Sequence, residues 1–252
     1  MKALVTRPRA DALALAEALA ARGIEAVIEP LVTIRPKPEA GALLDAALGG
    51  AQALLFTSAN AARVFAGASP RRDLAVFAVG DATARAAKAA GFARVESAQG
   101  AAAELAKLAA GRLKPAAGYL LHPAASHVAG DLAGVLARAG FRVQRAVIYE
   151  SLPVAGLSAG TAALLRRGEI GAALFFSPRT ASSFVRLAGE ASLTDSLAKT
   201  AAVALSAEVA GALRGLIWRR IAVAESPTES SLLAALERCR DAAATEERRV
   251  HE

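Results

Sequence analysis

A short pattern that occurs twice in this chain of 252 residues constrains its fold more than any other feature. In each copy, an apolar stretch ends in phenylalanine and hydroxyl-bearing residues, as Phe56-Thr57-Ser58-Ala59-Asn60 and as Phe175-Phe176-Ser177-Pro178-Arg179. Small residues follow, and then a further phenylalanine, Phe65 in the first copy and Phe184 in the second. A duplicated turn from a strand into a helix predicts two similar α/β lobes, each with a polar edge available to a ligand.

The rest of the chain alternates between apolar stretches typical of strands and alanine-rich stretches typical of helices. Gly91 and Gly140 each stand in an Ala-Gly-Phe sequence, where a left-handed residue would end a helix before the next strand. Near-continuous apolar strands between helices predict parallel sheets covered on both faces. The predicted strands are 2–6, 25–29, 53–57, 74–79, 93–96, 118–121, 142–149, 172–176, 200–205 and 220–224.

Two extended segments with prolines, at residues 30–38 and 148–153, interrupt this alternation. We interpret both as linkers. If the chain crosses between lobes at the first and returns at the second, a two-stranded hinge joins the lobes and a cleft separates them. Two consecutive domains are the alternative. The predicted parts are a discontinuous first lobe of residues 1–34 and 151–240, a second lobe of residues 38–147, linkers at 30–38 and 148–153, and a flexible tail at 241–252.

Composition argues against several classes of protein. Although 54% of the residues are hydrophobic, no apolar stretch reaches the length of about 20 residues that spans a membrane. The start of the chain leads directly into a strand without the features of a secretory signal, which predicts a cytoplasmic protein. With a single cysteine, Cys239, and three scattered histidines, neither a disulfide nor a metal site is expected. The net charge of +7 comes with dispersed arginines and only 4% aromatic residues, so a nucleic-acid partner is not expected either.

A ligand of an open parallel sheet binds beyond the carboxyl ends of the strands, where the repeated turns are expected to lie. Hydroxyls there, together with the N–H groups of the helices that follow, would suit carboxylates or phosphates. Three arginines beside these turns, Arg7, Arg85 and Arg179, fit the same chemistry. The simpler alternative is that each serine or threonine caps its own helix. Capping is favoured for any one position, and a shared ligand for the set that occurs twice.

The sequence contains no glycine-rich phosphate loop and no arrangement of a catalytic nucleophile, so neither a cofactor nor hydrolase chemistry is expected. Among groups able to move a proton, Tyr149 stands out, because it is predicted to end a strand within a linker, where a phenol would face the space between the lobes. A tyrosine in such a place packs more often than it reacts.

A set of short motifs, in this order and spacing, resembles the uroporphyrinogen-III synthase family. The resemblance extends from Met1 to about Arg240 and departs from the family pattern at His122-Pro123, where arginine-glycine is frequent, and at Ser206-Ala207-Glu208-Val209, which lacks a threonine. The motifs are Thr6-Arg7-Pro8, Pro30-Leu31, Phe56-Thr57-Ser58-Ala59-Asn60-Ala61, Ala78-Val79-Gly80-Asp81-Ala82-Thr83-Ala84, Val147-Ile148-Tyr149, Phe176-Ser177-Pro178 and Ala224-Glu225-Ser226-Pro227-Thr228.

The resemblance implies two α/β lobes, a cofactor-free site in the cleft and a linear tetrapyrrole substrate, hydroxymethylbilane, which carries many acetate and propionate groups. The implied reaction of haem biosynthesis removes water, closes the ring through a spiro intermediate and inverts ring D. Tyr149 matches the tyrosine of the family's cleft and is the candidate general acid. A cytoplasmic monomer that receives its substrate from the preceding enzyme is also expected. The candidate substrate-binding residues are Thr6, Arg7, Thr57, Ser58, Asn60, Gly80, Thr83, Ser177, Pro178, Arg179, Ser206 and Ser226.

Two other classes stay open at this point. One is a non-catalytic two-lobed module that binds a small polyanion, and the other is a nucleic-acid binder, which would need arginines clustered on one face.

Overall fold

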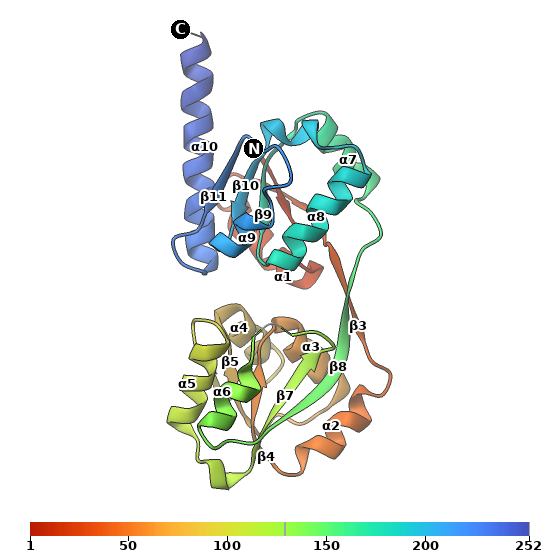
Figure 1. The fold of residues 1–252 in the computed structure, drawn as a ribbon, viewed down its shortest axis with the longest axis vertical. Helices are drawn as coiled ribbons and strands as arrows, with labels where there is room; N and C mark the ends of the chain where they lie inside the picture. Colours follow the sequence, from red (N-terminus) through yellow and green to blue (C-terminus); the bar gives the residue numbers. More distant parts are fainter. Residues whose placement is uncertain (129, 252) are drawn as a thin grey trace. The chain divides into compact units, whose positions relative to one another are not determined.

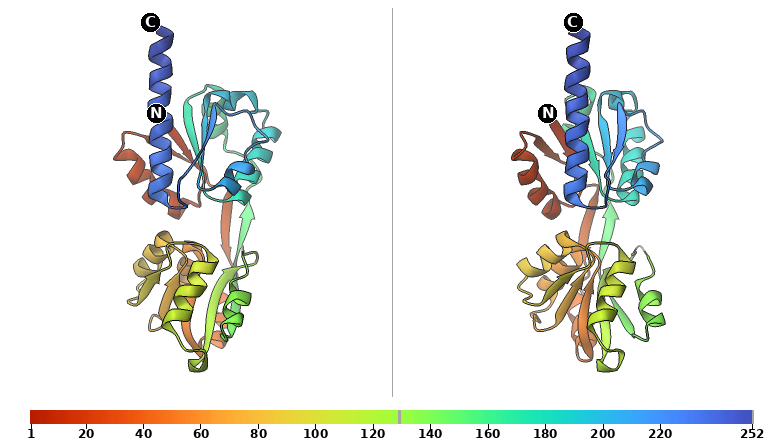
Figure 2. Two further views of the ribbon diagram at one scale, coloured as in Figure 1. Left: turned by 60° about the vertical axis from the view of Figure 1, so that its left-hand side comes forward. Right: turned by 90° about the vertical axis from the view of Figure 1, so that its left-hand side faces the viewer.

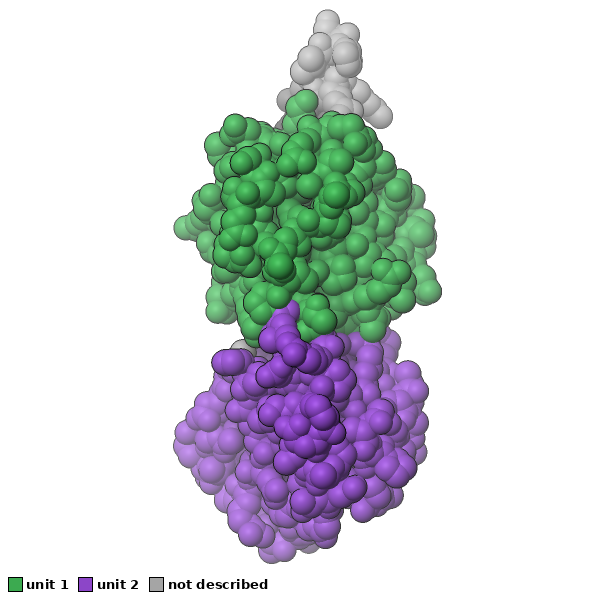
Figure 3. Space-filling model, turned by 90° about the vertical axis from the view of Figure 1, so that its right-hand side faces the viewer, with its two compact units in different colours: residues 1–33, 153–252 green, residues 34–152 purple. Residues whose placement is uncertain are grey.

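The computed structural model describes residues 1–128 and 130–251, and the side chains of all of these up to residue 242. The chain divides into two compact units, residues 1–33 with 153–252 (unit 1) and residues 34–152 (unit 2), which Figure 3 shows in different colours. Each unit contains one sheet with helices packed against it (Figure 1), so the predicted α/β class with parallel sheets is confirmed. The chain passes from unit 1 to unit 2 within β3 and returns at the end of β8.

Unit 1 contains a five-stranded sheet with the order β11-β10-β9-β1-β2, in which every pair of neighbouring strands is parallel. All its strands therefore end at the same edge, and the segments that follow them meet there. The strands are β1 (Lys2–Val5), β2 (Glu25–Ile28), β9 (Ile170–Phe175), β10 (Ala201–Ala204) and β11 (Arg220–Val223). The helices are α1 (Arg9–Ala20), α7 (Ala159–Arg166), α8 (Pro178–Glu190), η2 (Asp195–Lys199), α9 (Ala207–Gly211) and α10 (Glu229–His251).

The sheet of unit 1 separates two hydrophobic cores. Residues of β9 alternate between them, because successive side chains of a strand point to opposite faces: Phe175 packs with α7, α8 and α9, and Leu174 packs with α1 and α10. An aromatic cluster anchors the first core, where the rings of Phe175 and Phe184 meet edge to face at 5.2 Å and Trp218 stacks on Phe184 at 5.7 Å. Figure 2 shows helices on both faces of the sheet.

Unit 2 contains a six-stranded sheet with the order β3-β8-β7-β4-β5-β6. The pairs from β8 to β6 are parallel, so their carboxyl ends also share one edge. The strands are β3 (Val32–Pro36), β4 (Ala51–Phe56), β5 (Ala75–Ala78), β6 (Val95–Ser97), β7 (Tyr119–Ala125) and β8 (Val143–Pro153). The helices are α2 (Ala40–Leu48), α3 (Ala59–Ala68), α4 (Asp81–Ala89), α5 (Ala102–Arg112), η1 (Pro115–Ala117) and α6 (Leu132–Arg138).

The core of unit 2 repeats the arrangement of unit 1. Phe56 at the end of β4 meets Phe65 of α3 edge to face at 5.8 Å, as Phe175 meets Phe184 in the other unit. Phe56 packs on the face covered by α2, α3 and α4, whereas Leu55 packs on the face covered by α5 and α6. The duplicated sequence pattern therefore encodes a duplicated strand, turn and helix with the same aromatic contact.

The glycines expected to end helices have the required backbone conformation. The φ angles are 94° at Gly91 and 83° at Gly140, in the left-handed region that glycine adopts without steric cost. Each precedes a phenylalanine of its unit's core, Phe92 or Phe141.

Three segments differ from the strands predicted from the sequence. Residues 32–36, interpreted as part of a linker, form β3, and β8 continues to Pro153 without a break at Tyr149. β7 continues past Leu121 to Ala125 although it contains Pro123. Its pairing with β4 ends at Leu121, so the missing N–H of Pro123 costs no hydrogen bond to β4. α10 extends to His251. The expected flexible tail, residues 241–252, lies mostly outside the residues whose side chains are described.

Candidate active site

The carboxyl edge of the unit 1 sheet gathers predicted site residues from neighbouring strands. Ser226 follows β11, Ser206 follows β10, Ser177 follows β9 and Arg7 follows β1, which is the spatial order of the strands. The parallel sheet therefore brings together four segments that lie far apart in the sequence.

Arg7 is held in place by two interactions at this edge. Its Nη1 lies 2.9 Å from Oε2 of Glu229 at the start of α10, and its guanidinium lies 4.3 Å from the centre of the Phe176 ring. An arginine that stacks on an aromatic ring loses little freedom on binding an acid, since its orientation is already fixed. Its charge is shared with Glu229, so a substrate carboxylate would compete with that side chain.

Ser177 and Ser206 of unit 1 cap helices, as the simpler alternative proposes, whereas Ser226 does not. The Oγ of Ser177 accepts a hydrogen bond from the N–H of Thr180 at 3.2 Å, and the Oγ of Ser206 accepts one from Val209 at 3.3 Å. Ser226 is exposed, and its Oγ lies 3.2 Å from that of Thr228. Capping does not exclude ligand binding, because the N–H groups of the first turn beside the cap still point toward the edge of the sheet.

In unit 2, the matching positions follow β4 and β5. Ser58 caps α3 by accepting a hydrogen bond from the N–H of Asn60 at 3.2 Å, and Asn60 in turn accepts one from Arg63. Gly80 lies directly before α4 in extended conformation, and the space beside its Cα is open. The backbone of the turn is therefore accessible at Gly80, although Asp81 places a carboxylate there.

The starts of α3 and α8 differ electrostatically from the starts of the other described α-helices. Neither has an acidic residue at its cap or in its first turn, and both are capped by serine. Each of the other α-helices has a carboxylate at its cap, in its first turn or hydrogen-bonded to its first turn: Asp11, Glu39, Asp81, Glu104, Asp131, Glu29, Glu208 and Glu229. Because an internal carboxylate occupies the positive end of a helix, α3 and α8 are best suited to an external anion.

Thr57 lies directly before the cap of α3 and contacts a residue that the sequence analysis did not select. Its Oγ1 lies 3.0 Å from Nε2 of His122, which is buried in β7. Burial lowers the pKa of His122 to about 4, and the nearby charge of Arg145 acts in the same direction. The imidazole is therefore neutral at physiological pH.

Tyr149 does not face open space, which corrects the location expected from the sequence. Its side chain is 4% exposed and belongs to the hydrophobic core of unit 2, with Ile148 as a neighbour in the chain. The reason is a register shift between β7 and β8, where Ala124 pairs with Val147 and Ala125 with Tyr149. Such an irregularity turns a side chain toward the other face of a sheet.

Two other expected site residues are also buried. The hydroxyl of Thr6 is fully buried and donates to the carbonyl of Leu174 at 2.7 Å, so it joins β1 to β9. Thr83 is 5% exposed within α4. Pro178 and Arg179 form the first turn of α8, and Arg179 is exposed. The structure thus places Pro178 and Arg179 at the edge of the unit 1 sheet, and it buries Thr6 within unit 1 and Thr83 within unit 2.

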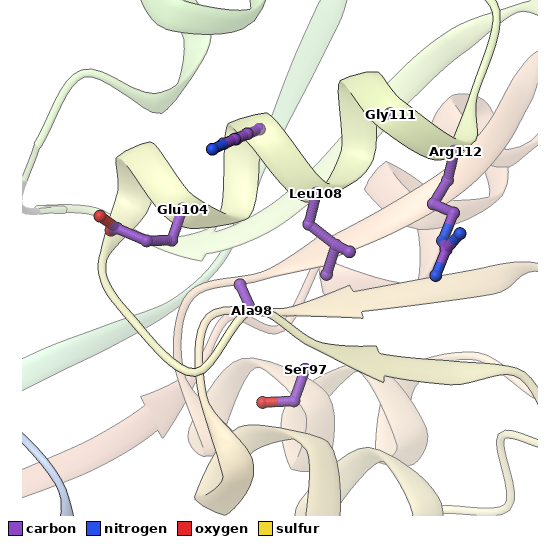
Figure 4. A pocket seen from close by; sticks show the side chains of 7 residues that line it. Ser97, Ala98, Glu104, Leu108, Gly111 and Arg112 are labelled. Atoms are coloured by element: carbon purple, nitrogen blue, oxygen red, sulfur yellow. The ribbon is translucent and has the colours of Figure 1, made fainter.

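A surface hollow of about 390 Å³ lies elsewhere in unit 2, along α5 (Figure 4). Ser97, Leu108 and Arg112 line it with four other residues, and none of them is a predicted site residue. Glu104 also lines it and accepts a hydrogen bond from the N–H of Ala101 at 2.9 Å. Lys107 and Arg112 also line the hollow, so both signs of charge lie there.

Within the described residues, no three histidine, cysteine, aspartate or glutamate side chains lie together as metal ligands would. No helix of the described part is both long and apolar enough to cross a membrane.

Comparisons with known proteins agree with the resemblance found in the sequence. Residues 14–234 match the model of the HEM4 family, which is described as uroporphyrinogen-III synthase HemD. A search of curated proteins finds no significant match.

Solved structures that resemble this chain support the same fold. A mutant uroporphyrinogen III synthase from the extremely thermophilic bacterium Thermus thermophilus is 21% identical, with a TM-score of 0.55 over 96% of this chain and 99% of the other. Uroporphyrinogen-III synthetase from Helicobacter pylori 26695 is 17% identical, with a TM-score of 0.59 over 93% of this chain and 97% of the other. At these identities, the likeness is one of fold.

Proposed function

Because the chain belongs to the uroporphyrinogen-III synthase family, we propose that it cyclises hydroxymethylbilane to uroporphyrinogen III, with loss of water and inversion of ring D. The family match over most of the chain is the observation that carries this proposal. The non-catalytic binding module gains no support from the fold or from the site.

The substrate explains why helix starts and hydroxyls matter here. Hydroxymethylbilane is a flexible chain of four pyrroles with acetate and propionate groups, and without an enzyme it closes to the I isomer. Its electron-rich pyrroles provide the reactive intermediates, so the task of the protein is to hold a conformation in which ring D is attacked at its substituted carbon.

The starts of α3 and α8 are the proposed anchors for the substrate's acid groups. Both offer backbone N–H groups and a serine cap, and neither has an acidic residue in its first turn. Arg7, stacked on Phe176, supplies a positive charge at the edge of unit 1, for which a substrate carboxylate competes with Glu229. Ser206, Ser226 and Gly80 extend the proposed binding surface along the two edges.

Tyr149 is the proposed general acid that helps the terminal hydroxyl to leave as water. It lies in the last part of β8, beside the end of β7, where Ser126 donates its N–H to the Tyr149 carbonyl at 3.0 Å. Because its side chain is only 4% exposed, the proposal requires local opening of this edge when the substrate binds. In Tyr149→Phe we expect a turnover number lowered by about 10-fold or more with the free energy of unfolding retained. An unchanged turnover number would remove the role.

The test of the proposed function is the isomer ratio of the product. The purified protein is incubated with freshly generated hydroxymethylbilane, the products are oxidised, and the uroporphyrin isomers are separated by chromatography. We expect an excess of the III isomer, whereas heat-denatured protein should leave the spontaneous I isomer. A ratio equal to that of the denatured control would refute the function.

The proposal includes a cytoplasmic monomer supplied by the preceding enzyme. Since hydroxymethylbilane closes spontaneously, the enzyme must work where the substrate is made. Each unit encloses its own hydrophobic cores, so neither needs a partner chain to bury them. Sedimentation of the purified protein at one chain per particle is the expected result, and a stable dimer would contradict it.

A further inference from the structure

The contact between Thr57 and His122 joins two neighbouring strands at the edge of unit 2. Thr57 follows β4 directly and precedes the serine cap of α3, whereas His122 lies within β7. The two side chains meet with Oγ1 and Nε2 3.0 Å apart. The histidine is 4% exposed and Thr57 is half-buried, so the pair lies between the interior of unit 2 and its surface.

The surroundings of His122 keep its ring neutral. Arg145 pairs with it in register on β8, and its guanidinium donates to the carbonyls of Ala125 and Ser126 at 2.5 and 2.6 Å. A fixed positive charge on the neighbouring strand disfavours a second one on the imidazole. A neutral imidazole has one nitrogen that donates and one that accepts, so it can impose a direction on a hydrogen bond.

We propose that His122 is a positioning residue for the reaction, which donates from Nε2 to the Thr57 hydroxyl and thereby leaves that hydroxyl's proton for a substrate carboxylate at the start of α3. The inference rests on the proposed function. In this arrangement, the acid group accepts hydrogen bonds both from the Thr57 O–H and from the first N–H groups of α3. His122 itself does not contact the substrate.

The other explanation of the pair is a buried histidine that fills space and satisfies its nitrogen with the nearest hydroxyl. The two explanations differ in substrate binding. A space-filling histidine affects folding whether or not Thr57 carries a hydroxyl, whereas a positioning histidine affects the Michaelis constant only through that hydroxyl.

A double-mutant cycle on steady-state kinetics distinguishes the explanations. Thr57→Val removes the hydroxyl and His122→Leu removes the donor, and hydroxymethylbilane is generated in the assay. We expect each single variant to raise KM by about 3- to 10-fold, the loss of one net hydrogen bond, with kcat within about twofold of the wild type. The double variant should have the KM of Thr57→Val alone.

A matched pair of polar variants covers the case in which His122→Leu does not fold. Gln reaches about as far as Nε2 and keeps an N–H donor there, whereas Asn reaches only as far as Nδ1. We expect His122→Gln to keep a KM within about twofold of the wild type. His122→Asn should raise KM by about 3- to 10-fold, as expected for the loss of one hydrogen bond.

If the wild type makes the III isomer, any of three outcomes would overturn the inference about His122. They are an unchanged KM in His122→Leu, a KM of the double variant that is the product of the two single effects, and equal KM values in the Gln and Asn variants. A wild-type protein that makes no III isomer would instead refute the proposed function, and the inference with it.

Discussion

The stability of unit 2 should fall steeply below pH 6.5 because of His122. Its pKa is about 4 in the folded protein, where burial opposes the charged ring, against about 6.5 in an unfolded chain. Between these values the unfolded state binds more protons than the folded state, so the free energy of unfolding decreases as the pH falls. Each pKa unit corresponds to about 1.4 kcal/mol, so the full loss approaches about 3 kcal/mol by pH 4.

The measurable interval is from pH 7 to pH 5. Over it, the same linkage gives a loss of about 2 kcal/mol. Hydrogen bonds with their arginine and lysine partners keep the pKa values of Asp73 and Glu169 at about 2, so these surface carboxylates stay ionised throughout. The interval therefore isolates the histidine from these acids.

Urea unfolding of the wild type and of His122→Gln at both pH values tests this reasoning. Circular dichroism follows the whole chain, and the fluorescence of Trp218, the single tryptophan, follows unit 1 as an internal control. We expect the wild type to lose about 2 kcal/mol more than the variant between pH 7 and pH 5. Since the two proteins share all other titrating groups, equal losses would refute the explanation.

Two substitutions in unit 1 test its packing. Glu29→Ala should lower the free energy of unfolding by about 3 kcal/mol, because the buried Glu29 carboxylate accepts hydrogen bonds from the N–H and hydroxyl of Ser158 at 2.8 and 2.6 Å and from Thr161 at 2.6 Å. Thermal unfolding measures this, with Glu29→Gln as the milder control, and a loss below about 1 kcal/mol would contradict it. Phe184→Ala should cost about 3 to 5 kcal/mol and shift the emission of Trp218, which stacks on Phe184. An unshifted emission would show that the stacked pair does not form.

Much of the fold could be predicted because strand and helix patterns agree with the tertiary packing. The repeat predicted two units of the same construction, and the contacts of Phe56 with Phe65 and of Phe175 with Phe184 explain it. β3 was missed because it ends in Pro36 and lies between Pro30 and Pro38, and prolines are typical of loops. Such a short strand forms only when a neighbour, here β8, provides its hydrogen bonds.

The site was predicted in part, for physical reasons that differ between residues. Ser58 and Ser177 lie at helix starts because hydroxyls cap helices, and this rule is local in sequence. His122 was missed because the strand was predicted to end at Leu121, and because its contact with Thr57 depends on strand pairing. The burial of Tyr149 depends on a register shift between β7 and β8 that no local pattern reveals.

A spectroscopic map of polyacid binding tests the central claim, that the starts of α3 and α8 hold the substrate's acid groups. Amide resonances of the isotope-labelled protein are followed by NMR while uroporphyrin III, the stable oxidised product, is added. We expect the largest shifts at the amides of residues 58–61, 177 and 179–181. Shifts confined to the hollow along α5, or none at concentrations that saturate the enzyme, would contradict the claim.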